Sequence, residues 1–261
     1  MGELIFVGLG LTGEDLGARA LRALREADRV FGEFYTSSLA DSSIEDMEER
    51  LGRKVTLLDR EEVEEGERIL EAAGEGRVAF VTAGDTMAAT THVDLRIRAE
   101  ERGIGTSLIH GISIFTAAAS ALGLQPYKFG RTVTLPFREG EYLPTSPYQR
   151  IAENRERGLH TLILLDIREE EGRFMTCQEG AEWLLAAEER VGRGLIGEDT
   201  LLCACARVGS SRERLIGGPP SRIVEEDLGP PLHCLVMPGE LHFMEARSLV
   251  LFADAPSVIQ D

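Results

Sequence analysis

Lysine is almost absent from this sequence, in which Lys54 and Lys128 are the only two. Lysine and arginine together number 28, against 45 aspartates and glutamates, so the formal net charge is −17. Non-specific binding to nucleic acid or to an anionic membrane surface depends on clustered positive side chains. The composition therefore argues against direct nucleic-acid binding and against attachment to a membrane surface.

Long apolar runs are also missing. A membrane-spanning helix needs about 20 predominantly apolar residues, and no window of this sequence approaches that length. Residues 1–10 carry no basic stretch followed by an apolar core, as a secretory signal peptide would. We therefore expect a cytoplasmic protein.

Cysteine is scarce, and Cys177, Cys203, Cys205 and Cys234 form no CxxC pair. Cysteine-based zinc sites usually contain such pairs, so no metal site is expected. Cys203 and Cys205 alternate along an apolar run, which is typical of small core residues on one face of a strand. A disulfide is left open, because cytosolic disulfides occur in hyperthermophiles.

The most informative stretch that is present covers residues 78–92, VAFVTAGDTMAATTH. Its apolar start at 78–81 predicts a strand buried on both faces of a parallel sheet, and residues 86–98 are expected to form a helix. Ligands of open α/β sheets bind outside the carboxyl ends of the strands. Asp85 is therefore a candidate ligand contact, and the alternative is that it caps the following helix.

A second strand-to-helix connection contains Gly8, Gly10 and Gly13, which match the GxGxxG spacing of dinucleotide-binding loops. Glu33 lies about 20 residues further on, as the ribose-binding acid of that motif would. Against this, Glu14 and Asp15 would place two negative charges at the helix start, where they repel a pyrophosphate. A nicotinamide-dependent oxidoreductase therefore stays open as a rival interpretation.

The order of the expected elements predicts an α/β protein with two domains. Residues 1–111 alternate strands with helices, which is typical of a parallel five-stranded sheet. Strands are expected at 4–9, 29–31, 54–58, 78–81 and 106–109, with helices at 15–27, 43–51, 60–73 and 86–98. Residues 112–261 predict a second α/β domain with a mixed sheet, because the runs at 201–208 and 214–217 flank a Gly-Ser-Ser turn as in a hairpin.

Several separated motifs agree on one family. They are the opening FVGLGLTGEDLG, YTSSL, the Gly-Asp pair followed by ATTH, LRIRA, YKFG, PTS, GLHTLILLDI, ARVGS and PGELHFMEA. Together they resemble, nearly from end to end, the diphthine synthase family of tetrapyrrole-methylase-like methyltransferases. Relatives usually carry proline on both sides of the Gly-Asp pair, whereas this sequence has Ala83 and Thr86.

The resemblance implies a tetrapyrrole methylase fold with S-adenosyl-L-methionine (SAM) in the cleft between the domains and S-adenosyl-L-homocysteine as product. The implied substrate is translation elongation factor 2, on which the amino group of a 3-amino-3-carboxypropyl-modified histidine would be methylated. The family usually forms homodimers, so a homodimer is expected here.

The resemblance also implies a set of cofactor contacts, which fall at or just beyond the ends of expected strands; those of the second domain are expected at 161–165, 201–208 and 232–237. The contacts are Leu11, Asp85, Ala88, Ser113, Ile114, Leu165, Val208 and His233. Without the resemblance, the apolar members would be read as ordinary core, and His233 as a surface histidine.

No residue stands out as the catalytic base that would deprotonate the amine, and Tyr35, His110 and Asp166 are all left open. Two further interpretations remain: a methylase of corrin-type tetrapyrroles, and a non-enzymatic module that binds a translation factor.

Overall fold

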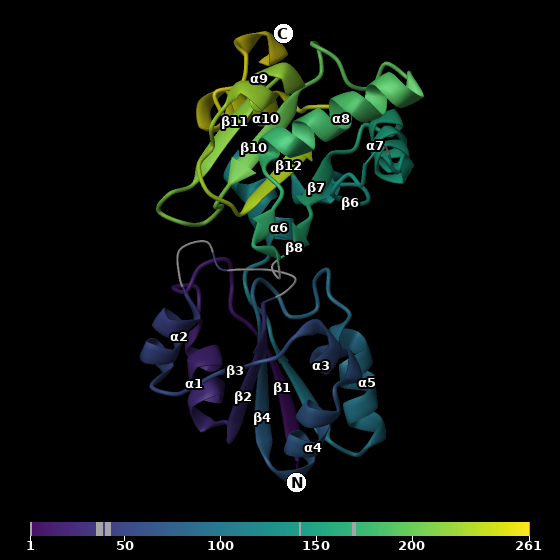
Figure 1. Cartoon of the computed structure of the whole chain (residues 1–261). Helices are drawn as coiled ribbons and strands as arrows, with labels where there is room; N and C mark the ends of the chain where they lie inside the picture. The colour runs from purple at the N-terminus through teal and green to yellow at the C-terminus, as the bar shows by residue number, and fades with distance from the viewer. Residues whose placement is uncertain (1, 35–38, 40–42, 141, 169–170, 261) are drawn as a thin grey trace. The chain divides into compact units, whose positions relative to one another are not determined.

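The computed structural model describes residues 2–34, 39, 43–140, 142–168 and 171–260. The chain divides into two compact units, residues 1–114 with 168–172, and residues 115–167 with 173–261 (Figure 1). We call them unit 1 and unit 2 and describe each by itself.

Unit 1 is a parallel sheet with helices on both faces. Its strands are β1 (Glu3–Gly8), β2 (Arg29–Glu33), β3 (Thr56–Leu57), β4 (Arg77–Thr82) and β5 (Gly105–Ile109), in the order β3-β2-β4-β1-β5. Every neighbouring pair is parallel. The helices are α1 (Ala18–Glu26), α2 (Ile44–Leu51), α3 (Arg60–Glu65), α4 (Glu67–Glu75) and α5 (His92–Glu101). The predicted five-stranded parallel sheet is confirmed.

Two apolar clusters hold these layers together, and they follow the alternation of side chains along the strands. Ile5 and Val7 of β1 face the cluster that contains Leu24 of α1 and Met47 of α2. Leu4 and Phe6 face the opposite cluster, which includes residues of α4 and α5. Figure 1 shows α1 and α2 on one side of this sheet and α3, α4 and α5 on the other.

The helix expected over residues 60–73 is wrong as a single element. Asp59 begins α3 with a capping box to Glu62, and Gly66 ends it in the left-handed region at φ +66°. A second helix, α4, starts at once. The apolar periodicity continues across the break, so the pattern of Val63 and Ile69 does not reveal it.

The helix expected over 86–98 begins six residues late, at His92. Residues 86–91 instead form a turn in which Ala89 has φ +58° and Thr90 Oγ1 donates to the Thr86 carbonyl. An alanine with positive φ interrupts a helix. The sequence does not reveal this position, because alanine is the best helix former.

Unit 2 contains the predicted mixed sheet, in the order β11-β10-β12-β7-β6. Its strands are β6 (Val133–Leu135), β7 (Thr161–Leu165), β10 (Leu202–Ala206), β11 (Arg214–Gly218) and β12 (His233–Met237). Among the five described strands of this sheet, β6 and β7 pair in parallel and the other neighbours are antiparallel, with β10 and β11 forming the expected hairpin. A separate ribbon joins β8 (Ile167–Arg168) to β9 (Arg173–Phe174), which the sequence did not predict.

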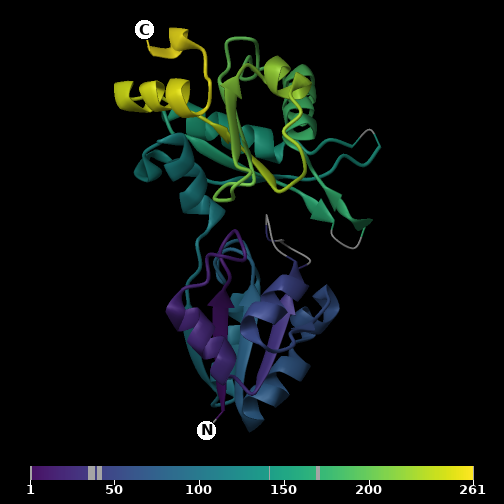
Figure 2. The ribbon, with the colours of Figure 1, turned by 90° about the vertical axis from the view of Figure 1, so that its left-hand side faces the viewer.

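Helices pack on both faces of this mixed sheet. They are α6 (Ile114–Leu122), α7 (Ser146–Glu156), α8 (Cys177–Val191), α9 (Pro220–Glu225) and α10 (Phe243–Phe252), with short 3₁₀ turns η1 (Pro126–Lys128) and η3 (Ser257–Gln260). The core under α7, α8 and α9 includes Tyr148, Trp183 and Ile223. Helix α10 lies on the side of the sheet opposite α8 and α9 (Figure 2). All four cysteines are buried and free.

Candidate functional site

The loops that follow β4, β1 and β5 pack tightly against each other at the carboxyl edge of the unit 1 sheet. Gly10 and Gly84 exchange two backbone hydrogen bonds, with N···O distances of 3.1 and 2.7 Å. A Cβ atom on Gly8 would lie 2.5 Å from the Gly111 nitrogen and 2.7 Å from the Gly84 carbonyl oxygen. The glycines at this edge therefore allow three backbones to meet, a sufficient reason for Gly8 without any nucleotide.

Asp85 lies at the centre of this edge. Its Oδ1 accepts a hydrogen bond from the Met87 N–H at 3.2 Å, and its Oδ2 accepts one from the Gly111 N–H at 3.2 Å. The same Oδ2 lies 2.8 Å from His110 Nδ1. Helix α5 begins at His92 with Thr91 before it, so the alternative that Asp85 caps that helix is wrong.

The glycine loop after β1 contains a carboxylate that binds the backbone of the same loop. Oδ2 of Asp15 accepts hydrogen bonds from the N–H groups of both Leu11 and Thr12, each at 2.8 Å. Asp15 does not stand at a helix start, as the sequence suggested, because α1 begins at Ala18. These two N–H groups are the kind that would bind a phosphate in a dinucleotide loop, and here a carboxylate holds them.

Glu33, the acid that the dinucleotide motif would need at the ribose, is fully buried. Its Oε1 lies 3.7 Å from Nε2 of His92, which is also buried. Burial lowers the pKa of His92, and the ring Nδ1 lies 3.3 Å from the Thr86 carbonyl oxygen. Glu33 therefore lies among the buried residues beneath the turn at 86–91, where it contacts His92.

The other predicted contacts of unit 1 lie at the same edge. Leu11, Ala88, Ser113 and Ile114 are all half-buried. The Ala88 N–H donates to the Asp85 carbonyl at 3.1 Å, and Ile114 is the first residue of α6. The structure thus brings the five predicted residues of unit 1 to the ends of three adjacent strands.

The predicted contacts of unit 2 gather at one edge of its sheet. Strand β12 runs antiparallel to β10 and β7, so its first residue lies beside their last ones. His233 pairs with Ala206, two residues before Val208, and Cys234 pairs with Leu164, next to Leu165. Leu165, Val208 and His233 are largely buried.

Both ring nitrogens of His233 are engaged within unit 2. Nδ1 accepts a hydrogen bond from the Cys177 N–H at 3.1 Å, and Nε2 lies 3.1 Å from the Pro230 carbonyl, to which it donates. Burial lowers the pKa of His233, which favours this neutral ring. A polar contact from the ring to a ligand would break one of these bonds, so His233 offers a ligand its ring face or backbone.

Arg207 is a residue that the sequence did not single out. It is buried, has φ +49°, and its guanidinium donates to the carbonyl oxygens of Leu228, Pro230 and Arg212. It thereby fixes the segment before β12 beside Val208. The available signal was an arginine at the end of the apolar run at 201–208.

Two of the three residues left open as the base can be placed. Both carboxylate oxygens of Asp166 accept backbone N–H bonds at 3.0 Å, from Ile167 and from Phe137. Asp166 thus stabilises the chain around it. His110 is bonded to Asp85 and mostly exposed. Tyr35 lies outside the described residues.

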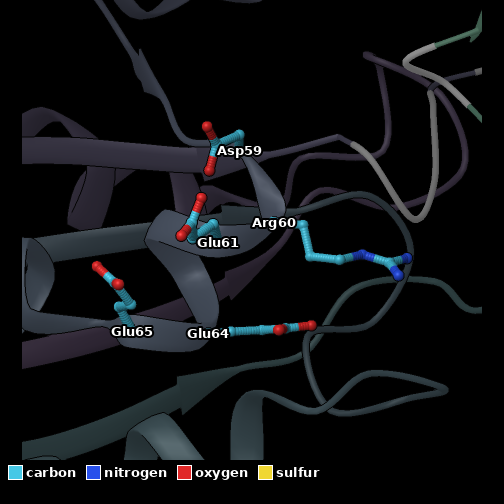
Figure 3. Close-up of a pocket in the computed structure, with 5 residues that line it drawn as sticks. All are labelled: Asp59, Arg60, Glu61, Glu64 and Glu65. Carbon is cyan, nitrogen blue, oxygen red and sulfur yellow. The ribbon is translucent and has the colours of Figure 1, made fainter.

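A shallow hollow on the surface of unit 1 is distinct from this edge. Asp59, Arg60, Glu61, Glu64 and Glu65 line it, and in Figure 3 their side chains diverge instead of converging on one point. Within the described ranges, no group of three or more histidines, cysteines, aspartates and glutamates could hold a metal ion. No helix in that part of the chain is long and apolar enough to cross a bilayer.

Comparisons with known proteins identify the class of protein to which this chain belongs. The family described as tetrapyrrole (corrin/porphyrin) methylases matches residues 3–222. The chain therefore belongs to the tetrapyrrole methylase family, and it is a methyltransferase.

Within that class, the similar proteins carry one name. A diphthine synthase of Methanothermobacter thermautotrophicus is 47% identical over 98% of this chain and 97% of its own length. One of Methanocaldococcus jannaschii is 46% identical over 94% of this chain and 97% of its own. A crystal structure of diphthine synthase superposes with a TM-score of 0.90 at 38% identity, covering 99% of this chain and 98% of that one. The resemblance drawn from the sequence, and the fold that it implied, are confirmed.

Proposed function

We propose that this protein is a SAM-dependent N-methyltransferase that acts on translation elongation factor 2. It methylates the amino group of the 3-amino-3-carboxypropyl side chain carried by a modified histidine. The observation that carries the proposal is the similarity to a diphthine synthase at 47% identity over 98% of the chain. Nothing in that similarity favours an oxidoreductase, and Asp15 already occupies the loop that a dinucleotide would need.

The carboxyl edge of unit 1 has groups that fit SAM. A carboxylate has about four acceptor positions, and the hydrogen bonds described above use three of those of Asp85. One position is left for a ligand N–H or O–H. A Cβ atom on Gly84 would meet no atom within 4 Å, so there is open space beside it.

The predicted SAM contacts include residues of both units. In unit 1, Leu11, Asp85, Ala88, Ser113 and Ile114 would contact SAM. The backbone at the start of α6 would suit the methionine carboxylate, because a helix N-terminus favours an anion. In unit 2, Leu165, Val208 and His233 would add apolar and ring surface.

When bound, SAM supplies the methyl group on a sulfonium, which is a good leaving group. The task of the protein residues is then to orient an unprotonated amine toward that methyl group and to exclude water. Alignment alone contributes a large share of the rate in such reactions, because it removes the entropy cost of bringing two molecules together.

The direct test is transfer of a radiolabelled methyl group from SAM to purified elongation factor 2 that carries the modified histidine. Unmodified factor is the control. Label on the modified factor alone supports the proposal, whereas label on a precorrin would favour the corrin-type methylase. Calorimetry with SAM and NADH separates both from an oxidoreductase, and SAM binding without transfer to either substrate would favour a binding module.

We propose further that the protein is a cytoplasmic homodimer. The support in unit 2 is α10, which has large apolar side chains that are 49–70% exposed, Phe243 and Met244 in its first turn and Leu251 and Phe252 in its last. Exposed apolar side chains of this kind are typical of interfaces. Light scattering should show a dimer that Leu251→Asp dissociates. Val93→Asp, at an exposed position of α5, should leave it intact.

A further inference from the structure

His110 and Asp85 form a pair with unequal exposure at the carboxyl edge of unit 1. His110 directly follows β5, and its Nδ1 lies 2.8 Å from Asp85 Oδ2. The Asp85 side chain is 16% exposed, whereas that of His110 is 69% exposed. The carboxylate is thus held inside the edge, and the imidazole extends outward from it.

This contact fixes which ring nitrogen of His110 carries the proton. An ionised carboxylate only accepts hydrogen bonds, so the neutral imidazole donates from Nδ1 and keeps a lone pair on Nε2. Asp85 cannot rotate freely, because the N–H groups of Met87 and Gly111 hold its two oxygens. The ring is therefore oriented by a carboxylate that is itself fixed by the backbone.

We propose that His110 is the catalytic base that removes the proton from the substrate ammonium group, with Asp85 as its positioning residue. This proposal rests on the proposed function, since it takes the amine of the modified histidine as substrate. An N–H bond of the ammonium breaks, and the proton goes to His110 Nε2. The electron pair stays on the amine nitrogen as the nucleophile for methylation, and the imidazolium returns its proton to water.

The charges around His110 suit this role. Asp85 contacts the ring and stabilises the imidazolium as it forms, as a carboxylate does in other histidine bases. The β1 loop carries two carboxylates: Asp15 is bound to the Leu11 and Thr12 N–H groups, and Glu14 is paired with Arg50 of α2. Glu33 at the end of β2 and His92 at the start of α5 are buried beneath the residue 86–91 turn.

The test compares wild type, His110→Ala and the control His242→Asn, which changes the other exposed histidine, at the start of α10. Methyl transfer to modified elongation factor 2 is measured from pH 6.5 to 9.5, and S-adenosylhomocysteine affinity by calorimetry. We expect His110→Ala to lower kcat/KM about 100-fold at pH 7, the lower end for loss of a general base. The defect should shrink as pH rises, because solvent then supplies more free amine. Affinity for S-adenosylhomocysteine should be unchanged. His242→Asn, in which asparagine can still cap α10, should keep wild-type methyl transfer at every pH.

Nitrogen NMR of labelled protein provides a readout that does not depend on activity. His110 should show the Nδ1–H tautomer, and Asp85→Asn should change it. A defect that is equal at every pH, a loss of S-adenosylhomocysteine affinity, or the Nε2–H tautomer would each overturn the assignment of His110. Wild-type protein that transfers no methyl group to the modified factor would instead contradict the proposed function, and the assignment with it.

Discussion

Replacing Asp15 by alanine tests whether the glycine loop after β1 is closed by its own carboxylate. The substitution removes the acceptor of two hydrogen bonds of 2.8 Å, from Leu11 and Thr12. Hydrogen bonds to a charged group contribute about 1.5 kcal/mol each at the lower end of their range, which suits this partly buried loop. The free energy of unfolding should therefore fall by about 3 kcal/mol in Asp15→Ala.

Asp15→Asn is the matched control, because both donors reach the same oxygen and an amide oxygen can also accept both. Only the charge is lost, and a neutral bond is about half as strong as a charged one. We expect a loss of about 1 to 1.5 kcal/mol. For a chain of this size, 1 kcal/mol shifts Tm by about 2–4 °C. Alanine should thus lower Tm by about 6–12 °C, and asparagine by at most about half as much.

Thermal unfolding of the full chain, followed by circular dichroism, measures both shifts. In Asp15→Ala the two N–H groups are freed to bind an anion, so inorganic phosphate should restore part of the lost Tm in this variant only. A Tm change in Asp15→Ala no larger than that of Asp15→Asn would refute the reasoning. NADH binding by wild type that Gly10→Val abolishes would reinstate the dinucleotide interpretation.

Three further predictions follow from the candidate site and the buried histidines. Asp85→Ala should weaken S-adenosylhomocysteine binding by about 1–3 kcal/mol, whereas Asp94→Ala, at an exposed position of α5, should leave it unchanged in calorimetry. Saturating S-adenosylhomocysteine should raise Tm and slow hydrogen exchange at both residues 81–90 and 208–235. Protection confined to the first segment would show that Leu165, Val208 and His233 are not cofactor contacts. Burial lowers the pKa of His92, His160 and His233, so the unfolded chain binds more protons than the folded one just below the ordinary histidine pKa. Stability should therefore fall as pH drops through about 6.5, and urea unfolding of His92→Gln should show a shallower fall; equal slopes would contradict this.

Glu245 belongs to a different pH range. Although its burial opposes ionisation, Lys128, His160 and the backbone N–H groups of Gln125 and His242 bond to the carboxylate and lower its pKa to about 2. The stability that it contributes is present above the ordinary glutamate pKa and is lost only as pH falls toward 2. The loss of stability expected as pH drops through about 6.5 is thus due to the buried histidines and not to Glu245.

Local pattern alone determined the kinds of elements and much of the fold class. Apolar runs gave β1 and β4, and the apolar run at 161–165 matched β7 at both ends. Side-chain periodicity is a property of neighbouring residues, so it survives without knowledge of the partners. Placing Leu165, Val208 and His233 near strand ends required no more than this.

Only the tertiary structure decided the chemistry at the edges. Asp85 meets His110 across 25 positions of sequence, and the ring of His233 meets the Cys177 N–H across 56. The role of Asp15 depended on the chain turning back over Leu11 instead of starting a helix. Hydrogen-bond partners of this kind are set by which strands lie side by side, and the order β3-β2-β4-β1-β5 is not written in any one segment of the sequence.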